Sequence, residues 1–109
     1  MAYGANSFDL LAQRSRALHG HRYVLPVAAW LLESDVKVAG VKEAMIGLEG
    51  RADRPRVIEA LVKLVEIGAL QELPRSPPRN SPRFFERLES PYWDTARGYA
   101  VEAERSLQD

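Results

Sequence analysis

The sequence contains no cysteine among its 109 residues. That absence excludes disulfide bonds and thiolate metal ligands, and it favours a cytoplasmic location. No stretch approaches the roughly 18 consecutive apolar residues that a transmembrane helix needs, so we expect no membrane span. The N-terminus also lacks a basic segment followed by an apolar run, and we therefore expect no signal peptide.

An excess of one charge is missing too, because 15 Lys and Arg side chains balance 15 Asp and Glu side chains. A neutral chain argues against indiscriminate coating of nucleic acid, but it allows one local basic face. A chain of this length is expected to form one domain over residues 1–109.

Groups that carry catalytic or metal chemistry are also scarce. His19 and His21 flank a glycine, but no carboxylate cluster completes a zinc site around them. No nucleophile with a base, phosphate-cradling glycine loop or spaced pair of catalytic carboxylates occurs. We therefore expect no metal, no cofactor and no enzymatic activity.

Apolar residues recur at helical spacing in the first third of the chain. Residues 7–18 form an amphipathic helix with Ser7 as a candidate N-cap. A second helix begins near residue 24, which places Pro26 in its first turn, where proline is tolerated. This second helix is apolar on most sides, as expected of a buried central helix.

The middle of the chain predicts a short strand around Val36–Val38 and a brief helix over "VKEAMIGLE". After the turn "EGRAD", Asp53 is the expected N-cap of the next helix and Gly68 its C-terminal cap. Two strands, "ALQEL" and "RFFERL", then flank the proline-rich loop "PRSPPRNSP". A last helix is predicted over residues 90–107 because Ser90 and Pro91 stand in the preferred order of cap and first-turn proline.

This order of elements is mainly α with a small β-hairpin, an α+β fold. Two helices joined by a tight turn, followed by a hairpin with a basic loop, make a winged helix-turn-helix. We expect this core over residues 24–88, with extra helices at residues 7–18 and 90–107.

Residues 24–88 resemble the winged helix-turn-helix transcriptional regulators of bacteria, of the ArsR/MarR kind. The resemblance rests on "VKEAMIGLEGRADRPRVIEALVKLVEIGAL" and on its close at Leu61, Leu64, Gly68 and Leu70. The segment "RFFERLESPYWDTARGYA" is similar to a second wing strand that runs into a C-terminal dimerisation helix. The resemblance implies sequence-specific binding of double-stranded DNA by a symmetric homodimer.

The helix that follows Asp53 carries the first candidate site. Arg54 and Arg56 lie at its N-terminus, where backbone amides and the helix dipole favour phosphate and where recognition helices contact bases. In the alternative reading the arginines are solvated, and Glu59 and Lys63 form a stabilising pair on a structural helix. The polar face is narrow, because apolar residues stand at positions 58 and 62.

The proline-rich loop carries the second candidate site. Its arginines recur every four residues with no acidic residue between Pro74 and Phe85, which favours contact with the DNA backbone or minor groove. In the alternative it is a polar hairpin tip whose prolines discourage edge pairing. The predicted DNA-binding residues are Lys42, Arg51, Arg54, Arg56, Lys63, Arg75, Arg79 and Arg83.

The terminal helices extend beyond the roughly 65 residues that the winged-helix core needs. Their aromatic and alanine residues favour close helix packing across a two-fold axis. In the alternative they cover the core of their own chain. The predicted dimer interface consists of Phe8, Leu11, Tyr92, Trp93, Ala96, Tyr99, Ala100, Ala103 and Leu107.

Two classes of function follow. The first is a homodimeric DNA-binding transcriptional regulator, with a recognition helix in the major groove and an arginine-rich wing on the backbone or minor groove. The second is an adaptor that binds another protein through an apolar face and has little or no affinity for DNA. No sensor motif identifies a small-molecule effector.

Overall fold

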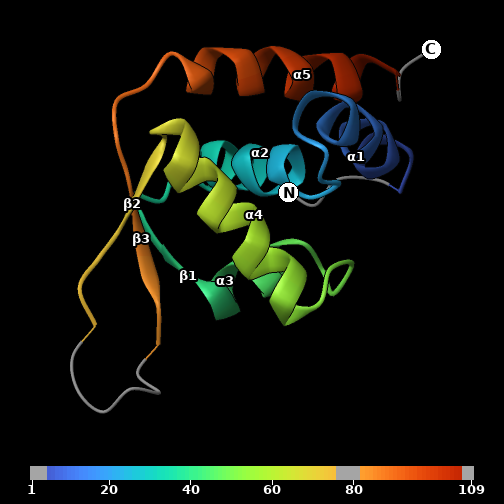
Figure 1. Ribbon diagram of the computed structural model, residues 1–109. Coiled ribbons are helices and arrows are strands. Elements are labelled where there is room, and N and C mark those ends of the chain that lie inside the picture. Colours follow the sequence, from blue (N-terminus) through green and yellow to red (C-terminus); the bar gives the residue numbers. More distant parts are fainter. Residues whose placement is uncertain (1–4, 76–81, 107–109) are drawn as a thin grey trace.

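The computed structural model describes residues 5–75 and 82–106 (Figure 1). Within these residues the chain is mainly helical and carries one small antiparallel sheet, which confirms the α+β class. The elements are, in chain order, α1 (Ala5–His19), α2 (Val24–Ser34), β1 (Val38–Gly40), α3 (Val41–Gly47), α4 (Arg54–Ile67), β2 (Leu70–Glu72), β3 (Phe84–Arg87) and α5 (Tyr92–Ser106).

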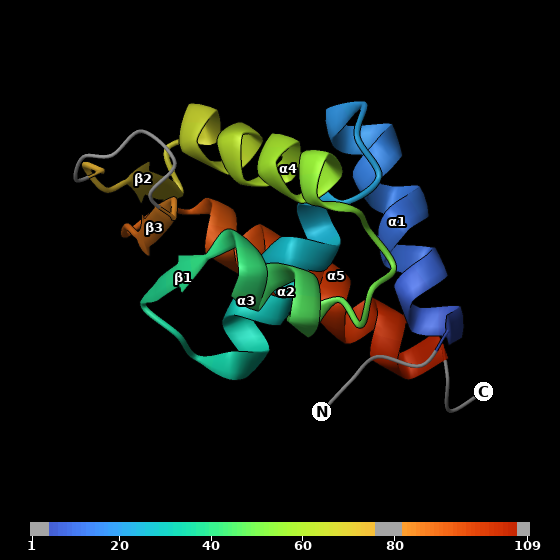
Figure 2. The same cartoon turned by 90° about the horizontal axis from the view of Figure 1, so that it is seen from below.

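Helix α2 lies at the centre of the molecule. Its side chains from Val24 to Ala29 are all buried, as the apolar pattern predicted. Helices α1 and α5 pack against each other and against α2, while α4 packs on α2 from another side (Figures 1 and 2). Pro26 lies in the first turn of α2, where it disrupts no helical hydrogen bond.

The three strands form a sheet in the order β1-β3-β2. Gly40 pairs with Phe84, and Gln71 pairs with Glu86. The first strand occupies Val38–Gly40, so the prediction of a strand around Val36–Val38 was wrong by two residues. The physical reason is that Asp35 ends α2 in a left-handed conformation, and the chain becomes extended only where it reaches β3.

Local capping chemistry defines α4 as predicted. The Asp53 side chain accepts a hydrogen bond from the Arg56 backbone amide at 3.1 Å. Gly68 ends the helix with φ of 91°, a left-handed conformation that glycine adopts without a steric penalty.

Two helix starts differ from the predicted ones. Ser7 is not an N-cap, because α1 already begins at Ala5 and the Ser7 side chain is buried. Helix α5 begins at Tyr92, two residues after the predicted start, and its first amide donates to the Ser90 hydroxyl oxygen at 3.1 Å. The predicted end of this helix, residue 107, lies outside the described residues.

Two helical glycines have opposite surroundings and give a direct test of the packing. A Cβ on Gly47 would overlap the Trp30 indole ring, whereas a Cβ on Gly98 would meet no atom within 4 Å. We expect Gly98→Ala to raise the free energy of unfolding by about 0.5–1 kcal/mol through helix propensity. We expect Gly47→Ala to lower it by about 1–3 kcal/mol, because the indole must move.

Urea unfolding of both variants measures these changes. Stabilisation by Gly47→Ala equal to that by Gly98→Ala would contradict the packing of α2 against α3.

Candidate nucleic-acid interface

A tight turn connects α3 and α4 and sets the position of the α4 N-terminus. Glu49 and Gly50 both have positive φ, and the Gly50 amide donates to the Met45 carbonyl at 3.3 Å. Ala52 is buried in the turn and anchors it to the core. The arginines at the start of α4 therefore follow directly on a fixed turn.

Helix α4 has one buried face and one exposed stripe. Its buried residues are Val57, Ala60, Leu61 and Leu64. Its exposed side chains include Arg54, Arg56, Glu59, Lys63 and Glu66.

The apolar residues that narrow the polar face of α4 also have a structural role. Ile58 is half-buried and packs against the hydrophobic core, and Val62 is half-buried as well. They flank the exposed stripe, so polar contacts with a ligand would come from a few long side chains.

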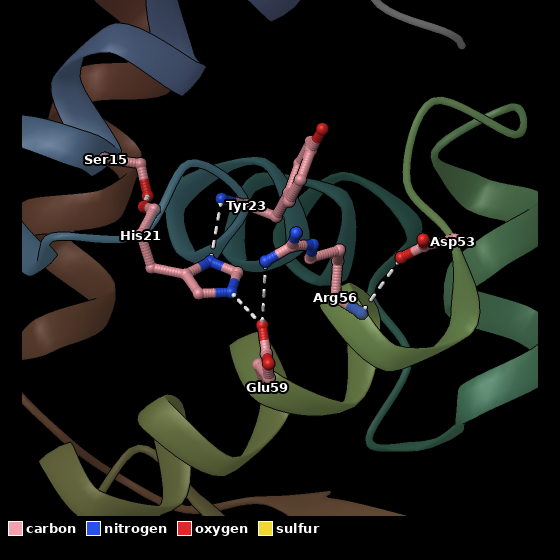
Figure 3. Close-up of polar contacts among 6 residues, drawn as sticks. All are labelled: Ser15, His21, Tyr23, Asp53, Arg56 and Glu59. Carbon is pink, nitrogen blue, oxygen red and sulfur yellow. Dashed lines mark hydrogen bonds and ion pairs between the residues drawn. The ribbon is translucent and has the colours of Figure 1, made fainter.

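A hydrogen-bonded network joins the α1–α2 loop to α4 (Figure 3). His21 Nε2 lies 3.1 Å from a Glu59 carboxylate oxygen, and His21 Nδ1 accepts from the Tyr23 backbone amide at 3.2 Å. Because Nδ1 is an acceptor, the ring proton is on Nε2 and donates to Glu59. Arg56 Nη1 lies 3.7 Å from the same carboxylate oxygen, so Glu59 is hydrogen-bonded to His21 and also forms an ion pair with Arg56.

Most of the predicted DNA-binding side chains are on the surface. Arg51 is half-buried, and its guanidinium carbon lies 5.0 Å from the centre of the Phe8 ring. Arg83 is half-buried and paired with Glu72, and Arg79 lies outside the described residues. The exposed members of the predicted set are Lys42, Arg54, Arg56, Lys63 and Arg75.

Arg83, the residue before β3, and Glu72, at the end of β2, form a two-point ion pair. Arg83 Nε and Nη2 each donate to one Glu72 carboxylate oxygen at 2.8 Å. These hydrogen bonds hold the pKa of Glu72 below its ordinary value, and the positive charges of Arg83 and Arg75 act in the same direction. The Arg83 guanidinium also lies 5.6 Å from the Phe85 ring centre. A phosphate contact by Arg83 would have to use the guanidinium N–H groups that this pair leaves free, chiefly those of Nη1.

Most of the residues predicted to form a dimer interface are buried inside their own chain. Leu11, Ala96 and Ala103 have no exposed surface, because α1, α2 and α5 pack together around them. Those three are core residues of the protomer and would reach a partner only if the helices separated, so their part in a dimer interface stays a prediction. Phe8, Tyr92 and Trp93 are also buried, Tyr99 and Ala100 are half-buried, and Leu107 lies outside the described residues.

The two histidines both take part in contacts between segments distant in sequence. His19 Nε2 lies 2.9 Å from the Tyr92 hydroxyl oxygen and connects α1 to α5. Burial lowers the pKa of His19, and the electrostatic effect of Lys63 and of the nearby His21 ring acts in the same direction. Burial raises the pKa of Tyr92, so both partners are neutral near neutral pH.

A second group of basic residues was not identified in the sequence. Arg16, in the last turn of α1, and Arg22, in the loop after it, line one pocket together with Arg56. Because these three residues lie in separate segments of the sequence, no regular spacing indicates that they line the same pocket. The sequence does hold one signal: Arg16 and Arg22 stand on either side of Gly20, and Gly20 ends α1 with φ of 69°.

No protein-family model, curated protein or solved structure matches the chain. None of the helices in residues 5–75 and 82–106 has the length and apolar character needed to cross a bilayer.

The Glu72–Arg83 pair predicts a pH-dependent part of the stability. The pKa of Glu72 in the folded state is below its ordinary value of 4.5. The ionised side chain therefore makes its full contribution to the free energy of unfolding above pH 4.5. This contribution is lost as the pH falls through the folded-state pKa. We expect Glu72→Gln to lower the free energy of unfolding by about 1 kcal/mol at neutral pH. The difference from wild type should shrink on acidification.

Urea unfolding at a series of pH values tests this, with Glu104→Gln as the control, since Glu104 is exposed on α5. An equal, pH-independent effect of the two substitutions would contradict the role of the pair.

Proposed function

We propose that the chain is a winged helix-turn-helix protein that binds double-stranded DNA and regulates transcription in the cytoplasm. The observation that carries the proposal is the placement of Arg54 and Arg56 on the first turn of α4, exposed and directly after a fixed turn from α3. A helix held in this way offers its N-terminal side chains to the major groove, where arginine recognises the acceptors of guanine.

The sheet supports the same role. Strands β2 and β3 form a hairpin beyond the C-terminus of α4, with β3 paired to β1 on its other side (Figure 1). The segment between β2 and β3 carries the exposed Arg75 and is the wing of the proposed fold. Basic side chains in such a segment contact phosphate and so position the protein on the duplex.

Glu59 is the main electrostatic obstacle to a DNA-facing α4. Its carboxylate is engaged by His21 and lies near the Arg56 guanidinium, so part of its negative charge is compensated within the protein. Glu59 therefore opposes phosphate less than an isolated carboxylate on this face would.

We further propose that the DNA-bound form is a homodimer. The two-fold contact must then use surfaces that remain exposed on α1 and α5, such as Leu18 and Val101, rather than the buried stripe. Two recognition helices in successive major grooves would follow from this symmetry.

A second candidate is a protein-binding adaptor, favoured by exposed apolar side chains next to the same helix pair. Ile46 on α3 is 67% exposed, and Val38 and Phe84 are 45% and 39% exposed on the outer face of the sheet. An adaptor would use this face and would show little affinity for duplex DNA.

Salt dependence of duplex binding, measured by fluorescence anisotropy, distinguishes the two candidates. We expect the logarithm of the affinity to fall steeply with the logarithm of salt concentration for the wild-type protein. Arg54→Ala should weaken binding by about 1–3 kcal/mol if Arg54 reads a base, or reduce the slope by about one if it contacts phosphate.

Arg105→Ala is the matched control, because it removes the same charge from the exposed last turn of α5. Equal effects of the two substitutions, or an absence of binding to every duplex including the upstream region of its own gene, would favour the adaptor.

A further inference from the structure

A basic pocket lies where α1 ends, α2 begins and α4 starts. Its volume is about 320 Å3, and it is lined by Arg16, Gly20, His21, Arg22, Tyr23 and Arg56. The three arginines come from three different segments: the last turn of α1, the loop and the first turn of α4. No acidic residue is among the lining residues.

The loop that carries Arg22 is fixed by a buried hydroxyl. The Ser15 side chain has no exposed surface; it donates to the His21 carbonyl at 2.6 Å and accepts from the Leu25 amide at 3.0 Å. Gly20 turns the chain with φ of 69°, and its amide donates to the Arg16 carbonyl at 2.9 Å. The pocket wall is therefore held in place by the protein itself.

The side chains of the pocket are also oriented. His21 is held through both ring nitrogens, by the Tyr23 amide and by Glu59, and it lies beside Arg56 (Figure 3). The Tyr23 ring packs edge-on against the His21 ring, with centres 5.9 Å apart. The Tyr23 and His21 rings thus form part of the pocket wall beside Arg56, and both ring nitrogens of His21 are engaged within the protein.

The positive charge of the pocket is incompletely compensated. Among the described residues, neither Arg16 nor Arg22 forms an ion pair. Arg56 approaches Glu59 at 3.7 Å, but both side chains are more than half exposed, so water weakens this pair and leaves donors of Arg56 for another acceptor.

Three guanidinium groups around one small cavity have a clear chemical preference. All three carry the same positive charge, which an anion bound in the pocket would offset, and the planar fork of each group matches the oxygen atoms of a phosphate. A carboxylate offers only two oxygens, whereas a tetrahedral phosphate presents oxygens in several directions to donors on several elements.

We propose that this pocket binds a phosphate group through Arg16, Arg22 and Arg56. The phosphate belongs either to a small phosphorylated molecule or to the backbone of a nucleic acid, since both present the same oxygens. The pocket does not depend on the proposed function. Of its three arginines, only Arg56 belongs to the predicted DNA-binding residues.

Titration with inorganic phosphate, at constant ionic strength against chloride, tests the site. Amide signals in two-dimensional NMR spectra should shift saturably for residues 20–23 and for the first turn of α4. Arg22→Gln should weaken phosphate binding at least about tenfold, because one charged two-point contact is lost. Arg105→Gln removes a charge far along α5 and should leave the affinity unchanged.

Two results would overturn the proposal. One is that phosphate shifts no signal beyond those shifted by chloride. The other is that Arg22→Gln and Arg105→Gln weaken binding equally, which would show a general surface effect. Loss of folding is excluded as a cause by comparing the unfolding midpoints of the variants in chloride.

The source of the phosphate is then determined by competition. If the pocket takes a backbone phosphate, inorganic phosphate should displace a duplex at constant ionic strength, and Arg22→Gln should weaken duplex binding. If it takes a small molecule, phosphate and duplex should bind together. Phosphate binding without any duplex binding would refute the proposed function and leave this site standing.

Discussion

One buried hydroxyl determines how the first two helices and the loop between them meet. Ser15 donates to the His21 carbonyl and accepts from the Leu25 amide, so a single side chain joins α1, the loop and the start of α2. An unpaired buried polar group costs about 1–3 kcal/mol, so alternative loop positions that break either bond are unfavourable. Fixing the loop also fixes His21, which in turn binds Glu59 on α4.

Two sets of contacts thus hold α4 in position. Its buried face packs on the central helix, and its exposed face is connected through Glu59 to the α1–α2 loop. The N-terminal arginines of α4 stand next to this second set of contacts. The proposed DNA-binding face of α4 and the proposed phosphate pocket both include Arg56, so a ligand at one would change the electrostatic environment of the other.

Local patterns in the sequence were sufficient to predict most of the helices and strands. They did not predict which other element each helix face packs against. Asp53 and Gly68 defined α4 because capping depends on neighbouring residues alone. Apolar periodicity identified the buried sides of α1 and α5 but not that they pack within one chain, since intramolecular and intermolecular helix packing have the same spacing. The roles of Ser15 and of the Glu72–Arg83 pair depend on tertiary contacts that no local pattern contains.

NMR mapping of a bound duplex is the most direct test of the proposed DNA-reading role of α4. Amide signals would be assigned in the free protein and followed during titration with a duplex from the upstream region of its own gene. We expect the largest shifts in α3, in the first turns of α4 and in the β2–β3 hairpin. Shifts confined to the outer surface of α5, or the absence of any saturable shift, would contradict a DNA-reading role for α4.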